Sequence, residues 1–182
     1  FMISANEAVT EIMEKEAWPF VYRVHEPPKP ESLQRFEVFA QALGLRPNVG
    51  DGKDPIMISR FVDSIKDKPY AQILHYLLLR SLKQARYEPV NHFHFGLASK
   101  AYTHFTSPIR RYPDLIAHRM LRRHLDSSEI TGKEMGKFEK ISIQSSEREV
   151  EAVRAERDSI KFKQVEYMLD KVGQEFDVTV SG

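Results

Sequence analysis

A long stretch without glycine or proline constrains this sequence more than any other feature. Neither residue occurs between positions 137 and 172, and charged residues dominate there. Glycine and proline are the main helix breakers, so the stretch predicts one long helix that Gly173 ends, with a single break near Ser145 and Ser146. No heptad of apolar residues runs through it. We therefore expect a solvated helix with one edge turned inward rather than a coiled coil.

The remaining sequence mixes shorter helices with short strands. Apolar residues at helical spacing predict five more helices, over 5–16, 31–43, 58–65, from Pro69 onward, and 113–125. Alternation of branched and aromatic residues predicts strands at 20–25 and 175–180, and a strand or extended loop within 87–97. We expect an α+β fold that is predominantly α-helical, with a few short strands.

Composition excludes several classes of protein. A chain of 182 residues suits one ordinary domain. The absence of cysteine excludes a disulfide scaffold, thiolate metal sites and a cysteine nucleophile, and it fits a reducing compartment. No apolar run is long enough for a membrane span, and Glu7, Glu11 and Glu14 interrupt any signal-peptide pattern. The expectation is a cytoplasmic protein with no membrane partner.

Charge is unevenly distributed although the net charge is only +1. Six basic residues and a single acid, Asp114, lie between Lys100 and Arg123, whereas acids outnumber bases in the remainder. A local basic zone favours an anionic ligand such as phosphate. A solvated basic helix face explains the charge equally well, and charge alone does not separate these two interpretations.

The segment around this zone contains groups that suit phosphate. Thr106 or Ser107 can cap a helix that begins at Pro108, and free N–H groups at a helix start favour an anion. Arg110 and Arg111 follow one turn later and can bind phosphate oxygens in a bidentate way. The aromatic residues nearby can stack on bases or pack in a core: Tyr102, His104, Phe105 and Tyr112. A capped helix with an arginine paired to Asp114 is the purely structural interpretation.

The order of these residues carries a resemblance. Residues 104–119 read HFTSPIRRYPDLIAHR, which closely resembles the signature of the ribonuclease II/ribonuclease R family (the RNB catalytic domain). Residues 1–7, 22–28 and 94–98 are also similar to family motifs, and residues 167–182 look like the join into an S1-type RNA-binding barrel. Arg111 and Pro113 make the ribonuclease R branch the better match.

The resemblance implies a domain organisation and an activity. Residues 1–172 would be the C-terminal half of an RNB exoribonuclease domain, and residues 173–182 the first strand of a truncated S1-type barrel. The implied enzyme is a hydrolytic, processive 3′→5′ exoribonuclease that degrades single-stranded RNA to nucleoside 5′-monophosphates. It would use Mg²⁺ held by an aspartate cluster.

The family's aspartate cluster precedes the position of Phe1, and no D-x-D-D run occurs in this sequence. We therefore expect one wall of the active site without its metal ligands, little activity from the isolated chain, and a missing N-terminal half of the catalytic domain as its partner. The chain would then be a fragment, a proteolytic product, a piece of a nicked enzyme or a natural short protein.

The resemblance also assigns roles to residues. Arg110 matches the arginine at the scissile phosphate, where it would stabilise charge in the transition state. Glu156 matches a glutamate that positions the 3′ end. The residues expected to contact RNA are Tyr102, His104, Thr106, Ser107, Arg111, Tyr112 and Arg119. No residue is expected to bind metal: a zinc site at His92, His94 and His104 is conceivable, but packing is the preferred interpretation.

Two other functions remain open. A chain without the aspartates can be a non-catalytic RNA-binding or scaffold module of the same fold. The basic zone can also contact an acidic partner in a protein-interaction domain. RNA binding that falls steeply with salt would separate the RNA-binding functions from the last one.

Overall fold

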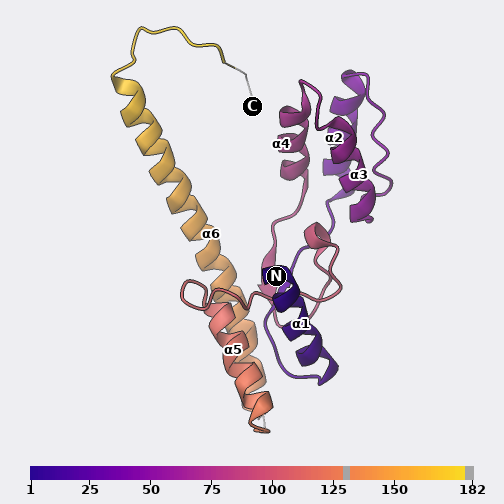
Figure 1. The fold of residues 1–182 in the computed structure, drawn as a ribbon, viewed down its shortest axis with the longest axis vertical. Helices are drawn as coiled ribbons and strands as arrows, with labels where there is room; N and C mark the ends of the chain where they lie inside the picture. Colours follow the sequence, from indigo (N-terminus) through magenta and orange to yellow (C-terminus); the bar gives the residue numbers. More distant parts are fainter. Residues whose placement is uncertain (129–131, 179–182) are drawn as a thin grey trace.

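The structure is a computed structural model, and it describes residues 1–128 and 132–178, apart from the side chains of 132–135. Its elements in chain order are α1 (Met2–Lys15), β1 (Tyr22–Val24), α2 (Pro30–Ala42), α3 (Pro55–Ile65), α4 (Ala71–Ser81), β2 (Arg86–Glu88), the 3₁₀ turn η1 (Phe95–Leu97), α5 (Tyr112–Leu125) and α6 (Gly132–Leu169). Figure 1 shows α6 and the α2–α4 group as two diverging arms, with α1 and α5 near their meeting point. The predicted predominance of helix is confirmed.

The molecule has two hydrophobic cores, one where the arms meet and one within the α2–α4 arm. The first core joins α1, both strands, α5 and the beginning of α6, with Phe20, Val24 and Met13 fully buried. The second joins α2, α3, α4 and η1 around Leu74 and Ile65. Burial of large apolar side chains is the main force that stabilises both cores. Because the signature and α6 belong to the first core, that core positions the candidate site.

The two strands form a short antiparallel ribbon in which Tyr22 pairs with Glu88 and Val24 pairs with Arg86. The segment before the signature lies along the other edge of β1, where the backbone N–H of Arg23 donates to the carbonyl of Tyr102 at 2.7 Å. Three residues a strand are too few for an independent sheet. Contacts with the neighbouring helices must therefore stabilise the ribbon.

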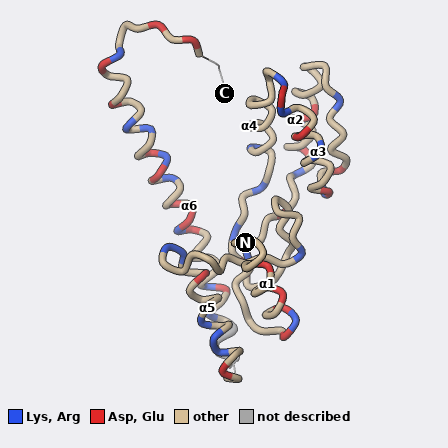
Figure 2. The backbone as a smooth tube through the Cα atoms, in the orientation of Figure 1, with Lys and Arg blue, Asp and Glu red and all other residues tan. Residues whose placement is uncertain are grey.

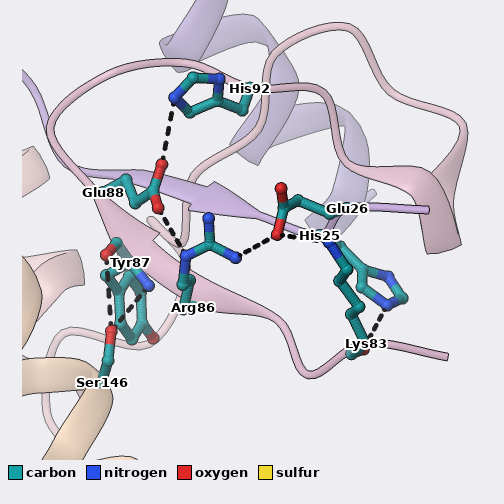
Figure 3. Close-up of polar contacts among 8 residues, drawn as sticks. All are labelled: His25, Glu26, Lys83, Arg86, Tyr87, Glu88, His92 and Ser146. Carbon is teal, nitrogen blue, oxygen red and sulfur yellow. Dashed lines mark hydrogen bonds and ion pairs between the residues drawn. The ribbon is translucent and has the colours of Figure 1, made fainter. Parts of the chain in front are cut away.

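Polar contacts fix the ends of the ribbon (Figure 3). The Arg86 guanidinium lies between two carboxylates and binds Glu26 at 2.8 Å and Glu88 at 2.5 Å. Lys83 also binds Glu26, at 3.1 Å. These bonds lower the pKa of the Glu26 carboxyl, the Arg86 bond most and the Lys83 bond second. The carboxylate therefore stays charged, and the connection from α4 into β2 is held close to the end of β1.

Helix α6 runs without interruption, so the predicted break at Ser145 and Ser146 is wrong. The Ser146 hydroxyl donates to the carbonyl of Ser142 at 2.8 Å and accepts the backbone N–H of Tyr87 at 2.8 Å. It bonds within the helix and to β2 at once, so it does not compete with the helical backbone. Figure 3 shows the contact between Ser146 and Tyr87.

The second half of α6 leaves the body of the molecule (Figure 1). From Val150 to the end of the helix its side chains are exposed, apart from half-buried Val153. Acidic and basic residues alternate along it (Figure 2), but it also exposes apolar side chains, which are Ile160, Phe162, Val165, Tyr167, Met168 and Leu169. None of the described helices, α6 included, combines the length and apolarity that crossing a membrane requires.

The strand predicted over 175–180 is not present in residues 175–178, and residues 179–180 lie outside the described residues. The alternating pattern is there, but these four residues have no neighbouring strand among the described residues to accept their backbone hydrogen bonds. An alternating pattern alone does not make a strand.

Candidate functional site

A groove of about 740 Å³ separates the start of α5 from α6. One wall comes from the turn at 108–110 and the first residues of α5, and the other from one face of α6. Its lining residues are Tyr87, Arg110, Arg111, Tyr112, Pro113, Ile141, Gln144, Ser145, Arg148, Glu149, Ala152, Val153 and Glu156. The groove therefore brings together Arg110, Arg111, Tyr112 and Glu156, four residues that the sequence predicts for one site.

The first wall is built around Asp114, whose side chain is completely buried. One of its carboxylate oxygens accepts the backbone N–H of Ser107 at 2.7 Å and an N–H of the Arg111 guanidinium at 2.8 Å. The carbonyl of Ser107 in turn accepts the N–H groups of Arg110 and Arg111. The chain closes into a tight turn, and the Arg110 side chain is exposed at its tip.

The helix predicted over 113–125 is confirmed to within one residue, whereas the alternative start at Pro108, capped by Thr106 or Ser107, is not formed. Helix α5 begins at Tyr112, with Arg111 in the capping position and Pro113 in the first turn; Pro108 lies in the turn before it. Proline is equally suited to both positions, because neither needs its missing N–H. The carboxylate of Asp114 decides between them: by holding the Ser107 N–H, it folds residues 107–111 back as a turn.

The second wall is one face of α6. Glu149 and Glu156 lie seven residues apart, which is almost two complete helical turns, so both side chains point to the same side. Ala152 and Val153 lie between them on the same face. The face is fixed to the ribbon by the Ser146 contact with Tyr87 and by Glu149, which binds Arg23.

Five charged side chains line the groove, and three of them are already paired. The three pairs are Arg111 with Asp114, Arg148 with Glu151, and Glu149 with Arg23. In the part of the chain that the structure describes, Arg110 and Glu156 have no ion-pair partner. One cation and one anion, on opposite walls, thus remain available to a ligand.

Aromatic and histidine rings lie behind this groove. Tyr102 is buried, and its hydroxyl accepts the side-chain amide of Asn6 at 2.8 Å. The Tyr87 hydroxyl contacts Nδ1 of His104 at 2.8 Å, and the His104 ring lies edge-on to both tyrosines. Tyr102 and His104 therefore support the groove from within in this structure. Their predicted contact with RNA stays a prediction.

Burial keeps the histidines of this layer neutral. It lowers the pKa of His104 to about 3 and that of His94 to about 4, with nearby positive charges as the smaller cause. Burial also lowers the pKa of His25. Nδ1 of His25 accepts the backbone N–H of Gly96 at 3.0 Å, so Nε2 carries the proton and donates to the carbonyl of Lys83. A Cβ at position 96 would lie 2.8 Å from this ring, which explains the glycine.

The other predicted RNA contacts lie apart from the groove. Thr106 and Ser107 are half-buried in the turn and do not line it, and Arg119 lies further along α5, away from the groove. The ring of His118 stacks on Phe105 with centroids 4.0 Å apart, and its Nε2 bonds the carbonyl of Phe105. Trp18 packs against the first core.

The described residues do not fit the Mg²⁺ that the family resemblance implies. Nowhere in residues 1–128 and 132–178, as far as their side chains are described, do three or more histidine, aspartate or glutamate side chains gather as a metal site needs. His92 instead pairs with Glu88 at 3.3 Å, and His94 packs between the rings of His25 and Tyr102. A magnesium ion therefore has no ligand set in this part of the molecule.

Sequence reasoning missed Arg23, Tyr87 and Glu149. Arg23 and Tyr87 both precede the signature; Arg23 lies in the stretch 22–28 that resembles a family motif, but the resemblance gave it no role, and Tyr87 looks like an ordinary strand residue. Glu149 is one of many charges on α6, but its spacing of seven from Glu156 was a usable signal. Two acids that share a helix face with small and apolar residues indicate an inward-facing edge.

The chain belongs to the RNB-domain family, whose model matches residues 1–127. Among curated relatives it is similar to ribonuclease R of Thermotoga maritima, with 44% identity over the whole chain and 26% of that protein's length. The chain thus spans about a quarter of the length of such relatives.

Solved structures agree with this family. Mycoplasma genitalium RNase R in complex with ribose-methylated single-stranded RNA matches with a TM-score of 0.91 and 32% identity, over 99% of this chain and 29% of that one. Yeast Ssd1, described as a pseudonuclease, matches with a TM-score of 0.71 and 25% identity, over 79% of this chain and 18% of that one. The fold therefore occurs both in an RNase R and in a pseudonuclease.

Proposed function

We propose that this chain is part of the catalytic domain of a hydrolytic, processive 3′→5′ exoribonuclease that degrades single-stranded RNA to nucleoside 5′-monophosphates in the cytoplasm. The observation that carries the proposal is the groove that Arg110 and Glu156 line without ion-pair partners among the described residues. The similarity to ribonuclease R over the whole chain supports it. On the same grounds, residues 173–182 begin an S1-type barrel.

The two available side chains have complementary tasks. The Arg110 guanidinium donates N–H groups to the oxygens of the scissile phosphate and stabilises the charge that grows there in the transition state. The Glu156 carboxylate can accept hydrogen bonds from the hydroxyls of the 3′-terminal ribose and so positions the end of the strand. Arg111 is bound to Asp114 and shapes the turn that presents Arg110.

Magnesium would be held by residues outside this chain. Its described side chains offer no ligand set, so this chain supplies the phosphate-binding wall only. The missing N-terminal half of the catalytic domain would then be its partner, and the isolated 182-residue chain would be inactive.

The full-length gene product that contains this chain tests the proposal. It should release mononucleotides from 3′-labelled single-stranded RNA with Mg²⁺ and stop when EDTA is added. The products should carry a 5′-phosphate, and residues 1–182 alone should release none. Internal cleavage, or products with a 3′-phosphate, would contradict the proposed reaction.

A non-catalytic RNA-binding or scaffold module is the second candidate, because a pseudonuclease shares this fold. In that case the full-length product should bind single-stranded RNA with an affinity that falls steeply with salt, yet release no nucleotide. The same assay therefore separates the two functions.

A further inference from the structure

Arg23 does not line the groove, yet its contacts reach the groove's far wall. It lies on β1, and its side chain is only 12% exposed. Its guanidinium binds both carboxylate oxygens of Glu149, at 2.5 and 3.0 Å, across 126 residues of sequence. The same guanidinium lies over the Tyr87 ring, 4.7 Å from its centroid. A planar guanidinium that is held by a carboxylate at its edge and by an aromatic ring at its face has little freedom to rotate.

Among the described polar contacts, this pair is the last along α6 that joins the helix to another element. Beyond Glu149, the ion pairs of α6 within the described residues are internal to the helix, as in Arg154 with Asp158 and Lys163 with Glu166. The rotation of the helix about its own axis is thus fixed at Ser146 and Glu149. Since Glu156 follows Glu149 by almost two full turns, the bond to Arg23 also determines which way Glu156 faces.

The pair also determines the charge of the groove. Glu149 lines the same groove as Arg110 and Glu156. Without a partner its carboxylate would repel a phosphodiester in a confined site, and the groove would hold two uncompensated acids. The Arg23 guanidinium neutralises the Glu149 carboxylate from β1, outside the groove. Because the guanidinium is largely buried there, it does not attract the ligand away from the groove.

We propose that Arg23 is a positioning residue for RNA: it neutralises Glu149 and fixes the face of α6 that carries Glu156, so that the groove admits a phosphodiester strand. The inference rests on the proposed function, because it takes single-stranded RNA as the ligand. Arg23 acts through Glu149 and does not contact the strand.

A set of charge variants in the full-length gene product tests this role. The measurement is anisotropy of a labelled single-stranded oligoadenylate in EDTA, which reads binding without cleavage. Arg23→Ala should weaken binding about tenfold, or roughly 1.4 kcal/mol, the effect of one uncompensated carboxylate facing the strand. Arg23→Ala with Glu149→Gln should return to within about threefold of the wild type, because the uncompensated carboxylate is gone and the Ser146 contact with Tyr87 still holds α6.

Two controls complete the set. Arg122→Ala removes an exposed arginine of α5 that is paired with Asp126 and does not line the groove. Because exposed ion pairs contribute little, this variant should bind RNA within about twofold of the wild type. Arg23→Lys keeps the charge but not the fork, so it should lie between wild type and Arg23→Ala. If Arg23→Ala does not fold, Glu149→Gln alone is informative, because it should bind at least as tightly as wild type.

The outcomes separate the inference from the proposed function. Wild-type protein that does not bind RNA overturns both. Wild-type binding with Arg23→Ala unchanged overturns only the role of Arg23. A double variant that binds as weakly as Arg23→Ala would mean that Arg23 is merely structural, and weaker binding by Glu149→Gln would mean that the Glu149 carboxylate itself is needed. Rescue by Glu149→Gln is what a charge-compensating residue requires.

Discussion

The two walls of the groove are built in different ways. The wall that presents Arg110 folds on itself: within eight residues of sequence, the Asp114 carboxylate holds both the Ser107 N–H and the Arg111 guanidinium. The wall that presents Glu156 is a single long helix whose direction depends on contacts with β1 and β2, 126 and 59 residues away. One wall is a local product of sequence, whereas the other exists only in the folded molecule.

Substitution of Asp114 should have the largest effect and should destroy the local wall. Asp114→Ala leaves a buried guanidinium without its counter-charge, which costs about 3–5 kcal/mol. Urea unfolding should show this loss. Asp126→Ala, at the exposed end of the same helix, should change stability by less than about 0.5 kcal/mol. If the two variants are equally stable, the turn is not built around Asp114.

Arg110→Ala should lower turnover without lowering the stability of the wall that presents Arg110. We expect turnover to fall about 10²- to 10³-fold, because one donor to the transition state is lost, whereas RNA affinity should fall much less. Stability should not change, since the side chain is exposed. Glu156→Ala should be milder in turnover. Single-turnover kinetics with a binding titration would detect a parallel collapse of rate and affinity, which would make Arg110 a binding residue only.

Acid should destabilise the aromatic and histidine rings that lie behind the groove. His25, His94 and His104 have folded pKa values below the unfolded value of 6.5. The unfolded chain therefore takes up protons first as the pH falls. The contribution of these histidines to stability should be constant above about pH 6.5 and should decline from there to about pH 4 for His94 and about pH 3 for His104.

The slope of that decline is at most about 1.4 kcal/mol per pH unit for each histidine. Urea unfolding at several pH values measures it. His94→Phe should flatten the decline between pH 6.5 and about 4. An unchanged slope in that variant would show that His94 is accessible to protons in the folded state.

Ser146→Ala should give the smallest effect and test the attachment of α6 to β2. The change removes the acceptor of the buried Tyr87 N–H, and we expect a loss of about 1 kcal/mol. Ser145→Ala, the preceding residue on the same helix, is the matched control and should be nearly neutral, since no side-chain bond joins it to β2 among the described contacts. Equal thermal midpoints for the two variants would argue that Ser146 does not hold the helix.

The local wall is also the one that sequence reasoning anticipated best. The purely structural interpretation of residues 104–119 included the pairing of an arginine with Asp114, and that pair is present because the contact is short in sequence. The role of Arg110 stays a prediction. Sequence reasoning predicted α5 over 113–125, one residue from the observed start, but also left a start at Pro108 open, since Pro108 and Pro113 both suit a first turn and only the buried carboxylate chooses between them. The choice depends on burial, which is not visible in the local pattern.

The distant wall shows the opposite balance. The existence of α6 followed from the absence of glycine and proline, but its rotation did not, because that depends on Arg23 and Tyr87 in a ribbon formed far upstream. The two serines that suggested a break instead include the residue that attaches the helix. Propensity describes a helix in isolation, whereas its orientation is a tertiary property.

The long helix also acts as a lever with its fulcrum at Glu149. Leu169 lies about 30 Å along the axis from that point and Glu156 only about 10 Å. A tilt of about 5° at the fulcrum would move the far end by about 2.6 Å and Glu156 by only about 0.9 Å at a rise of about 1.5 Å per residue. Displacements of the exposed end thus reach Glu156 reduced about threefold, so the site can tolerate a moving end while keeping its own geometry.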